Sequence, residues 1–253
     1  MSDPSFLLVH GACHGAWCWR DLLSAMKARG LKARAIDLPG HGRDHTDYTE
    51  VSLDSYKRAI LEDISKHGGP VILVGHSAGG YPITAAAQDA PDKIVQLVYL
   101  CAYVPEAGKS IADLRRAATR QPILEAIERT DDGRAFLFRR DKIADALFHD
   151  CPEDTLEYAR DNLCPEAIAP QNTALTALDA AFSRPRSYIL CEHDRLIPPE
   201  EQARMTAVWP EGSIHHLPSG HSPYFAISAN NRRRKFGILK AIKNASASDC
   251  EPK

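Results

Sequence analysis

Short apolar runs rich in Val, Ile and Leu alternate with helical segments along most of this chain, and this alternation constrains the fold more than any other feature. A strand that is apolar throughout is buried on both faces, which is typical of a parallel sheet whose strands are joined by helices. The sequence therefore predicts an α/β fold with a mainly parallel, six-stranded sheet flanked by helices. The expected strands cover residues 6–9, 31–37, 71–74, 94–100, 187–191 and 213–217.

Helical patterns follow most of these runs, and the expected helices cover residues 17–28, 52–66, 81–89, 199–208 and 223–244. The alternation stops between residues 105 and 183, where the sequence is mainly helical, charged and irregular. We expect this part, called the cap segment below, to be a mostly helical insertion that covers one end of the sheet. The predicted domains are an α/β core of residues 1–104 and 184–253 and a cap of residues 105–183.

The charge balance makes nucleic acid and membranes poor candidates for partners. The 31 Lys and Arg residues nearly match the 33 Asp and Glu residues, so the 253-residue chain has a net charge of −2 and no broad attraction to phosphate or anionic lipid. No apolar stretch approaches the roughly 18 to 20 residues of a membrane-spanning helix, and the amino end lacks the basic start of a signal peptide. We expect a soluble, cytoplasmic protein.

Seven cysteines without C-x-x-C spacing argue against both a disulfide framework and a zinc cluster. We expect them to be reduced thiols in or near the core, with a bridge between Cys13 and Cys18 as the one alternative. No cluster of histidines and carboxylates requires an ion, so the sequence predicts neither a metal nor a cofactor.

The segment Gly75-His76-Ser77-Ala78-Gly79 fits the pattern G-x-S-x-G and lies between an expected buried strand and an expected helix. In that context the serine occupies a tight, strained turn that raises its hydroxyl above the sheet, and the glycines on either side leave room for neighbouring elements. The amides at the start of the following helix favour a developing negative charge at the same point. Ser77 is therefore the predicted nucleophile; the alternative is a glycine-rich turn with an incidental serine.

A serine hydroxyl needs a base to take its proton, and a histidine held by a carboxylate is the usual base. Asp194 follows the strand expected at residues 187–191, at the carboxyl end where sites on α/β sheets form, and Glu192 is the rival acid. His221 lies in a loop just after the last expected strand. The order Ser77, Asp194, His221 is the order that such a triad takes on this type of fold.

The tetrahedral intermediate of acyl transfer also needs hydrogen-bond donors for its oxyanion. One donor is typically the backbone N–H after the nucleophile, here Ala78, and the second comes from the loop after the first strand. Gly11 lets the backbone approach closely there, and the Ala12 N–H is the predicted second donor. The alternative for this loop is a His-Gly turn that serves only packing.

Together these motifs resemble the plant methylesterase and hydroxynitrile lyase group of α/β-hydrolases and its bacterial esterase and pyrethroid-hydrolase relatives. The resemblance implies an α/β-hydrolase fold. It is weakest within the cap segment, from about Gly108 to Thr176, where substrate choice is decided. In the cyanohydrin-cleaving lyases a threonine stands at the position of Gly11 and a lysine follows the catalytic histidine, whereas Ser222 follows it here. Plant methylesterases tend to have a methionine after that histidine. The segments that carry the resemblance are residues 9–17, 74–80, 99–105, 193–198 and 219–222.

Three functions are therefore compared. The leading hypothesis is a serine-nucleophile carboxylic ester hydrolase, acting on a small to medium ester through an acyl-enzyme. The alternatives are a lyase of the hydroxynitrile type, against which Gly11 and Ser222 speak, and a non-catalytic small-molecule receptor, against which an intact triad speaks. The expected partner is a small-molecule ester, and the sequence leaves a homodimer open. Four aromatic residues of the cap segment are candidates either for a substrate pocket or for the core of the cap: Phe136, Phe138, Phe148 and Tyr158.

Overall fold

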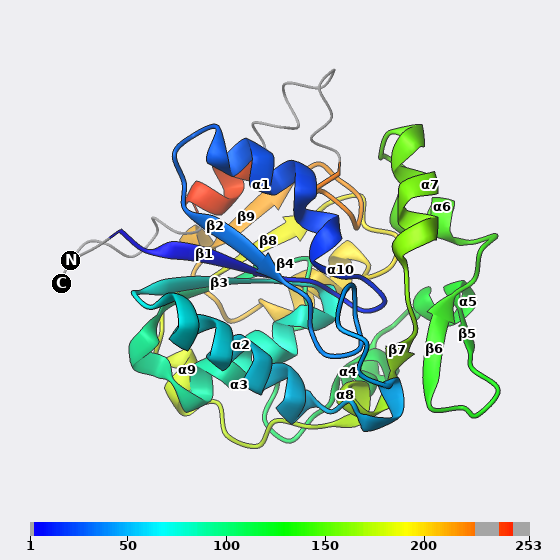
Figure 1. The fold of residues 1–253 in the computed structure, drawn as a ribbon, viewed down its shortest axis with the longest axis horizontal. Coiled ribbons are helices and arrows are strands. Elements are labelled where there is room, and N and C mark those ends of the chain that lie inside the picture. The colour runs from blue at the N-terminus through cyan, green and yellow to red at the C-terminus, as the bar shows by residue number, and fades with distance from the viewer. Residues whose placement is uncertain (1–2, 226–237, 245–253) are drawn as a thin grey trace.

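A computed structural model describes residues 3–225 and 238–244 of the chain. Its main sheet has six strands in the order β2-β1-β3-β4-β8-β9, and every pairing between neighbours is parallel (Figure 1). The predicted parallel six-stranded α/β fold is therefore confirmed. The strands are β1 (Ser5–Val9), β2 (Ala33–Ile36), β3 (Val71–His76), β4 (Ile94–Leu100), β8 (Arg186–Cys191) and β9 (Ile214–Leu217).

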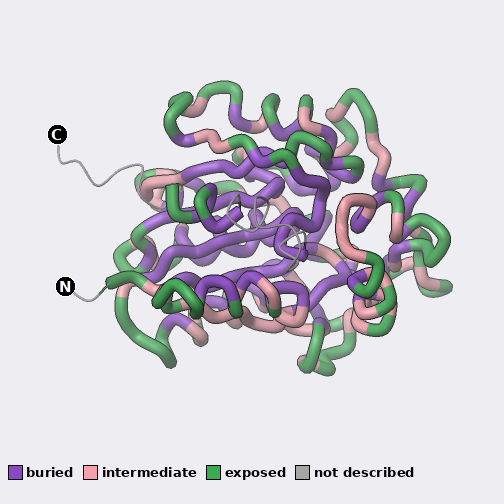
Figure 2. Tube along the Cα trace, turned by 90° about the horizontal axis from the view of Figure 1, so that it is seen from above, coloured by how far each residue is buried: buried purple, intermediate pink, exposed green. Residues whose placement is uncertain are grey.

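Alternate side chains of the central strands enter two separate apolar cores, one on each face of the sheet. In β1, Phe6 and Leu8 pack on one face with α1 (Arg20–Lys27). Leu7 and Val9 pack on the other face with α2 (Leu53–His67) and α3 (Gly80–Asp89). This two-sided burial explains why the strands are apolar throughout, as the buried centre in Figure 2 illustrates.

The helices around the sheet start and end close to the expected positions. α2 begins at a capping box in which the side chains of Ser52 and Ser55 each bond the other's backbone N–H. Pro82 lies in the first turn of α3, where its missing N–H costs nothing. The helices that flank the sheet are α1 (Arg20–Lys27), α2 (Leu53–His67), α3 (Gly80–Asp89), α9 (Asp179–Phe182) and α10 (Pro199–Met205), with short 3-10 turns at Ala16–Trp19, Tyr48–Glu50, Ser77–Gly79, Pro91–Lys93 and Glu211–Ser213.

The last expected helix, residues 223–244, falls largely outside the described residues. Of its span, residues 238–244 are helical, and Ile238 and Ile242 are buried in the same core as α1.

The cap segment is mainly helical, but it also holds a three-stranded antiparallel sheet that the sequence analysis does not predict. These strands are too short to show an alternating pattern in the sequence. The middle strand also buries two successive residues, Ala135 and Phe136, as well as Phe138, so its burial does not alternate strictly. Its elements are α4 (Ile111–Ala117), α5 (Ile123–Ala126), β5 (Ile127–Arg129), β6 (Ala135–Phe138), α6 (Ile143–Leu147), α7 (Glu153–Asn162), β7 (Glu166–Ala167) and α8 (Ile168–Asn172).

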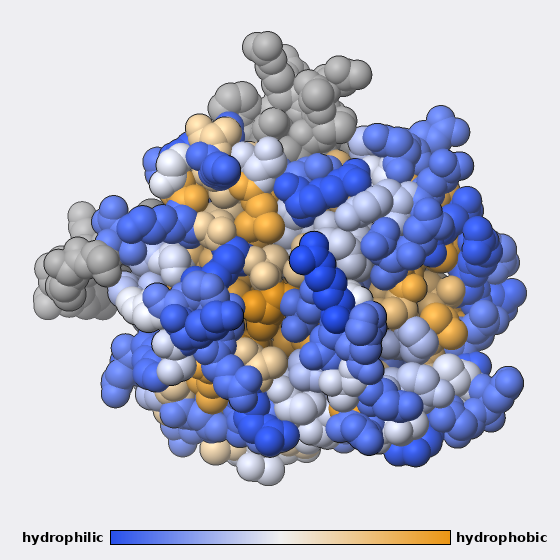
Figure 3. Space-filling model, viewed as in Figure 1, coloured by the Kyte–Doolittle hydropathy of each residue, from blue (hydrophilic) through white to orange (hydrophobic). Residues whose placement is uncertain are grey.

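Polar side chains dominate the face in Figure 3, with apolar residues visible in hollows between them. In the described part of the chain, the large apolar residues that are exposed are Val95, Leu124 and Val208. None of the described helices combines the length and apolar character required to cross a bilayer.

Helix α3 packs so closely on the chain after β4 that its first residue must be glycine. A Cβ atom at Gly80 would overlap the carbonyl oxygen of Tyr103, although the φ of −60° at Gly80 suits any residue. We expect Gly80→Ala to lower the free energy of unfolding by about 1–3 kcal/mol, the usual cost of overpacking, in urea denaturation. The matched control is Gly212→Ala, where a Cβ meets no atom; an equal loss in both variants would contradict the packing argument.

Candidate active site

Ser77 lies on a strained turn between β3 and α3. Its φ of 53° places a non-glycine residue in the left-handed region, and its carbonyl accepts a hydrogen bond of 3.0 Å from the Tyr103 N–H. A Cβ atom at Gly75 would lie 2.7 Å from the Gly79 oxygen, and one at Gly79 would lie 2.7 Å from the His10 oxygen. The turn that presents Ser77 therefore requires glycine at both positions.

The structure brings Ser77, Asp194 and His221 together from the ends of three strands. The Nδ1 atom of His221 lies 2.8 Å from Oδ2 of Asp194, and its Nε2 atom lies 3.1 Å from Oγ of Ser77. An ionised carboxylate can only accept, so Nδ1–H donates to Asp194 and the unprotonated Nε2 can accept the hydroxyl proton of Ser77. All three side chains are buried, and this tautomer is the one that removes a proton from serine.

Asp194 is fixed by four hydrogen bonds. Its Oδ1 atom accepts from the backbone N–H groups of Leu196 (2.8 Å) and Ile197 (2.9 Å), and its Oδ2 atom accepts from Gln202 Nε2 (3.1 Å) as well as from His221. Gln202 is fully buried on α10 and also accepts from the Cys191 N–H at 3.0 Å. The sequence analysis did not identify Gln202. Its position in the helix that directly follows Asp194 is the one feature of the sequence that could have pointed to it.

Glu192, the rival candidate for the acid, pairs with a surface histidine instead of His221. Its side chain is 42% exposed and pairs with His216 at 3.3 Å. Glu192 and His216 therefore form a surface contact, and the structure does not bring this carboxylate to His221.

Two further histidines lie beside His221 and are uncharged. Burial lowers the pKa of His76 well below its usual value and lowers the pKa of His14 to about 4. The Nε2 atom of His76 lies 2.8 Å from the backbone oxygen of His221 and donates to it. Since neither ring carries a charge, neither opposes the positive charge that His221 acquires when it takes a proton.

Hydrogen bonds to the carbonyls of Gly11 and Ala12 fix the peptide units before and after Ala12. The Gly11 carbonyl accepts from His10 Nδ1 at 2.9 Å and from the His14 N–H at 3.3 Å, and the Ala12 carbonyl accepts from His14 Nδ1 at 2.8 Å. Because a peptide unit is planar, fixing the Gly11 carbonyl also fixes the direction of the Ala12 N–H. Among the described residues no group accepts from that N–H, and Ala12, Ser77 and Ala78 line one cavity.

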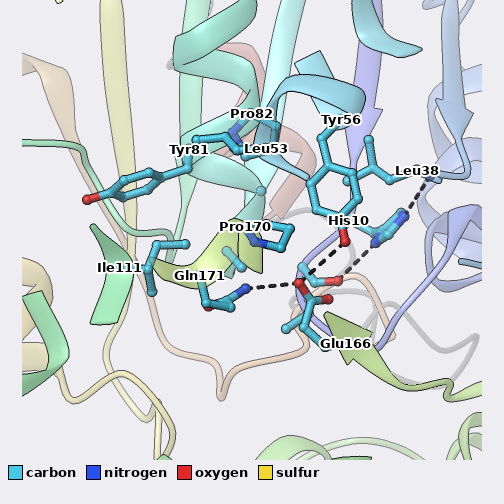
Figure 4. A pocket seen from close by; sticks show the side chains of 14 residues that line it. His10, Leu38, Leu53, Tyr56, Tyr81, Pro82, Ile111, Glu166, Pro170 and Gln171 are labelled. Atoms are coloured by element: carbon cyan, nitrogen blue, oxygen red, sulfur yellow. Dashed lines mark hydrogen bonds between the residues drawn. The ribbon is translucent and has the colours of Figure 1, made fainter. Parts of the chain in front are cut away.

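Glu166 of the cap segment holds the same loop through the backbone of Cys13. Figure 4 shows its hydrogen bonds with Gln171 and Tyr56. Its Oε2 atom accepts from the Cys13 N–H at 3.2 Å and pairs with His41 Nε2 at 2.9 Å, and its Oε1 atom accepts from Gln171 at 3.0 Å and Tyr56 at 3.5 Å. The φ of Cys13 is 62°, so this contact fixes a second strained residue. Glu166 thus connects the cap segment to the loop that presents Ala12.

Glu166 and His41 form a buried ion pair. Burial alone raises the pKa of Glu166, but the charge and hydrogen bond of His41 outweigh it and the net pKa is lowered. Burial alone lowers the pKa of His41, and Glu166 reverses this so that the net pKa is raised. Both shifts favour the charged pair. Neither residue was singled out from the sequence, because His41 and Glu166 are 125 positions apart.

Ser77 and His221 line one narrow cavity. Of the four aromatic residues proposed from the sequence, Phe138 lines this cavity. Phe136 and Phe148 are buried in the core, and Tyr158 packs edge-on against Trp17. Phe138 therefore fits the pocket hypothesis, and Phe136 lines a neighbouring surface groove.

One group of three described residues could offer ligands to a metal: His76, Cys101 and His221. Both ring nitrogens of His221 are already bonded, to Asp194 and Ser77, and the Cys101 thiol donates to the His221 backbone oxygen. An ion at this point would disrupt the Ser77–His221 contact, so these residues do not fit a resident metal. Cys13 and Cys18 are both free thiols, which excludes the bridge considered between them.

A model of the α/β-hydrolase family matches residues 6–229. The chain belongs to this family. This hydrolase is 32% identical over 234 residues to a pheophorbidase from Raphanus sativus, covering 88% of this chain and 89% of that protein. It is 28% identical over 238 residues to a pyrethroid hydrolase from Sphingobium wenxiniae, covering 90% and 84%.

Solved structures agree with these matches. A pyrethroid hydrolase from Sphingobium faniae superposes with a TM-score of 0.83 at 25% identity, over 96% of this hydrolase and 98% of that chain. A methylesterase from Arabidopsis superposes with a TM-score of 0.79 at 27% identity, over 95% and 99%. The predicted resemblance to methylesterases and pyrethroid hydrolases is therefore confirmed.

The buried ion pair gives a testable pH dependence. The pKa of His41 is raised on folding, so its contribution to stability is full below the unfolded pKa of about 6.5 and is lost as pH rises through the folded pKa. The pKa of Glu166 is lowered on folding, so its contribution to stability is full above the unfolded pKa of about 4.3 and is lost as pH falls through the folded pKa. We expect Glu166→Gln to lower the free energy of unfolding by about 3 kcal/mol near pH 6, with a smaller difference at higher pH, measured by urea denaturation across pH.

The matched control is Glu128→Gln, at an exposed glutamate of β5. We also expect Glu166→Gln to lower kcat about tenfold, less than the loss of an oxyanion donor, since the Ala12 loop is less firmly held. A pH-independent difference, or an equal loss in both variants, would contradict the role of the ion pair.

Proposed function

We propose that this hydrolase cleaves carboxylic esters through an acyl-enzyme, with Ser77 as nucleophile, His221 as base and then acid, and Asp194 as the group that orients His221. The observation that carries the proposal is the continuous hydrogen-bond chain from Asp194 through His221 to Ser77 at the floor of a cavity. The names of its relatives, pheophorbidase, methylesterase and pyrethroid hydrolase, support the ester class.

In the first half of the reaction, Ser77 Oγ attacks the ester carbonyl while Nε2 of His221 takes the hydroxyl proton. The carbonyl oxygen becomes an oxyanion, for which the backbone N–H groups of Ala12 and Ala78 are the proposed donors. His221 then gives its proton to the leaving alkoxide, which departs as the alcohol. Asp194 stabilises the intervening imidazolium.

In the second half, water loses a proton to His221 and attacks the acyl carbon. The tetrahedral intermediate collapses, the bond to Ser77 Oγ breaks, and His221 returns the proton to that oxygen. The carboxylic acid is released and the enzyme is restored. No cofactor is required by these steps.

The lyase alternative is disfavoured by the space at Gly11. A Cβ atom there would lie 2.7 Å from Cβ of Ser77 and 2.9 Å from Nδ1 of His76, so a threonine does not fit this backbone. Ser222 is fully buried and supplies no cation after the histidine. A non-catalytic receptor would not need the hydrogen bonds that His221 forms with Ser77 and Asp194.

Three further predictions complete the proposal. The α/β core comprises residues 1–104 and 184–253, and the cap comprises residues 105–183. A cytoplasmic location is supported by buried thiols such as Cys13 and Cys18 that form no disulfide. A homodimer remains a prediction that light scattering can test.

We expect Ser77→Ala to lower kcat for p-nitrophenyl acetate and butyrate by at least about a thousandfold, because the covalent route is lost. The control Ser24→Ala removes an exposed hydroxyl of α1 and should leave activity unchanged. Mandelonitrile cleavage is measured in parallel. Cyanide release without ester turnover would favour the lyase, and ligand binding without either reaction would favour the receptor.

A further inference from the structure

Arg115 of α4 is a cation at the wall of the catalytic cavity. Its side chain lines that cavity together with Ser77 and His221 and is half-buried. No hydrogen bond or ion pair to the Arg115 guanidinium occurs within the described residues. Two nearby arginines do form ion pairs: Arg116 with Asp113 at 2.5 Å and Arg204 with Glu201 at 2.7 Å. Arg115 is therefore left without an internal anion.

The cavity offers Arg115 no carboxylate. Its remaining lining is apolar, neutral or part of the proposed triad, and contains no Asp or Glu: Ala12, His14, His76, Ala78, Tyr103, Ile123, Phe138, Leu147, Gln171 and Leu196. Arg115 is thus the one lining residue with a permanent charge.

Tyr103 provides a second donor beside Arg115. Burial raises the pKa of Tyr103, and the nearby positive charge of Arg115 partly opposes that rise, so the net pKa stays high and the phenol remains protonated. In the described part of the structure no group pairs with its hydroxyl. Arg115 and Tyr103 therefore present donors to one cavity whose lining contains no carboxylate.

A surface groove reaches the same arginine. Three arginines line this groove, Arg115, Arg116 and Arg129, together with apolar and amide side chains but no carboxylate. Arg115 and Gln171 line both the groove and the catalytic cavity, so they lie between the two. Such a cationic approach attracts anions and disfavours cations.

A half-buried guanidinium loses part of its hydration, and a planar, bidentate anion restores the lost hydrogen bonds. We propose that this enzyme prefers esters that carry a free carboxylate away from the reacting carbonyl, and that Arg115, assisted by Tyr103, binds that carboxylate. This inference rests on the proposed esterase function and specifies its substrate class. The apolar residues Ile123, Phe138 and Leu196 would contact the carbon chain between the carboxylate and the ester.

The test compares the monomethyl esters of succinate, glutarate and adipate with neutral methyl esters of the same acyl carbon number, methyl butanoate, pentanoate and hexanoate. Methanol release gives kcat and KM for the wild type, Arg115→Met and Arg115→Lys. The control is Arg58→Met, which removes an exposed cation of α2 outside the cavity and the groove.

We expect the wild type to favour at least one half ester over its neutral partner. Arg115→Met should lower kcat/KM for that half ester by about 10- to 100-fold, the range for a hydrogen bond to a charged group. The loss should appear mainly as a higher KM, because the carboxylate is bound equally in the substrate complex and in the transition state. Neutral esters should change less than about twofold. Arg115→Lys should retain part of the preference, and Arg58→Met all of it.

Equal losses for charged and neutral esters, or no preference in the wild type, would overturn the proposal while leaving the esterase function in place. Binding is measured separately by calorimetric titration of monomethyl glutarate into Ser77→Ala and Ser77→Ala/Arg115→Met. Binding that requires Arg115 supports the anion site even if no ester is turned over, an outcome that would refute the esterase function alone. Equal binding by both variants refutes the anion site.

Discussion

The parallel direction of the six strands is the constraint on which the rest of this structure depends. Parallel strands end at one edge of the sheet, so the loops after β1, β3, β8 and β9 meet there although they are far apart in the sequence. These four loops carry Gly11–Ala12, Ser77, Asp194 and His221. The hydrogen bonds that join Ser77, Asp194 and His221 are a consequence of that shared edge.

Backbone strain and buried polar contacts then fix the groups at this edge. Ser77 and Cys13 both have positive φ values, and each is held by a hydrogen bond from or to a distant segment, Tyr103 in the first case and Glu166 in the second. Strain of this kind persists only where surrounding contacts enforce it. The glycine contacts at the Ser77 turn and the Glu166–His41 pair supply that enforcement.

The cap segment acts on the chemistry as well as covering it. Through Glu166 it reaches the loop that presents Ala12, and through Arg115 it sets the charge of the cavity wall. A change of cap sequence can therefore alter both the substrate class and the rigidity of the donors, while the sheet edge stays the same.

The sequence by itself determined the six strands of the main sheet, the helices α1, α2, α3 and α10, and the places of Ser77, Asp194 and His221 at strand ends, because two-sided burial, G-x-S-x-G spacing and strand ends are local patterns. Only the tertiary structure decided which carboxylate faces His221, that Gln202 and Glu166 hold the site, and that Arg115 lacks an internal anion. It also revealed the small sheet of the cap segment. The physical reason is that charge pairing and burial arise between segments far apart in the chain, as between His41 and Glu166, and no local pattern records them.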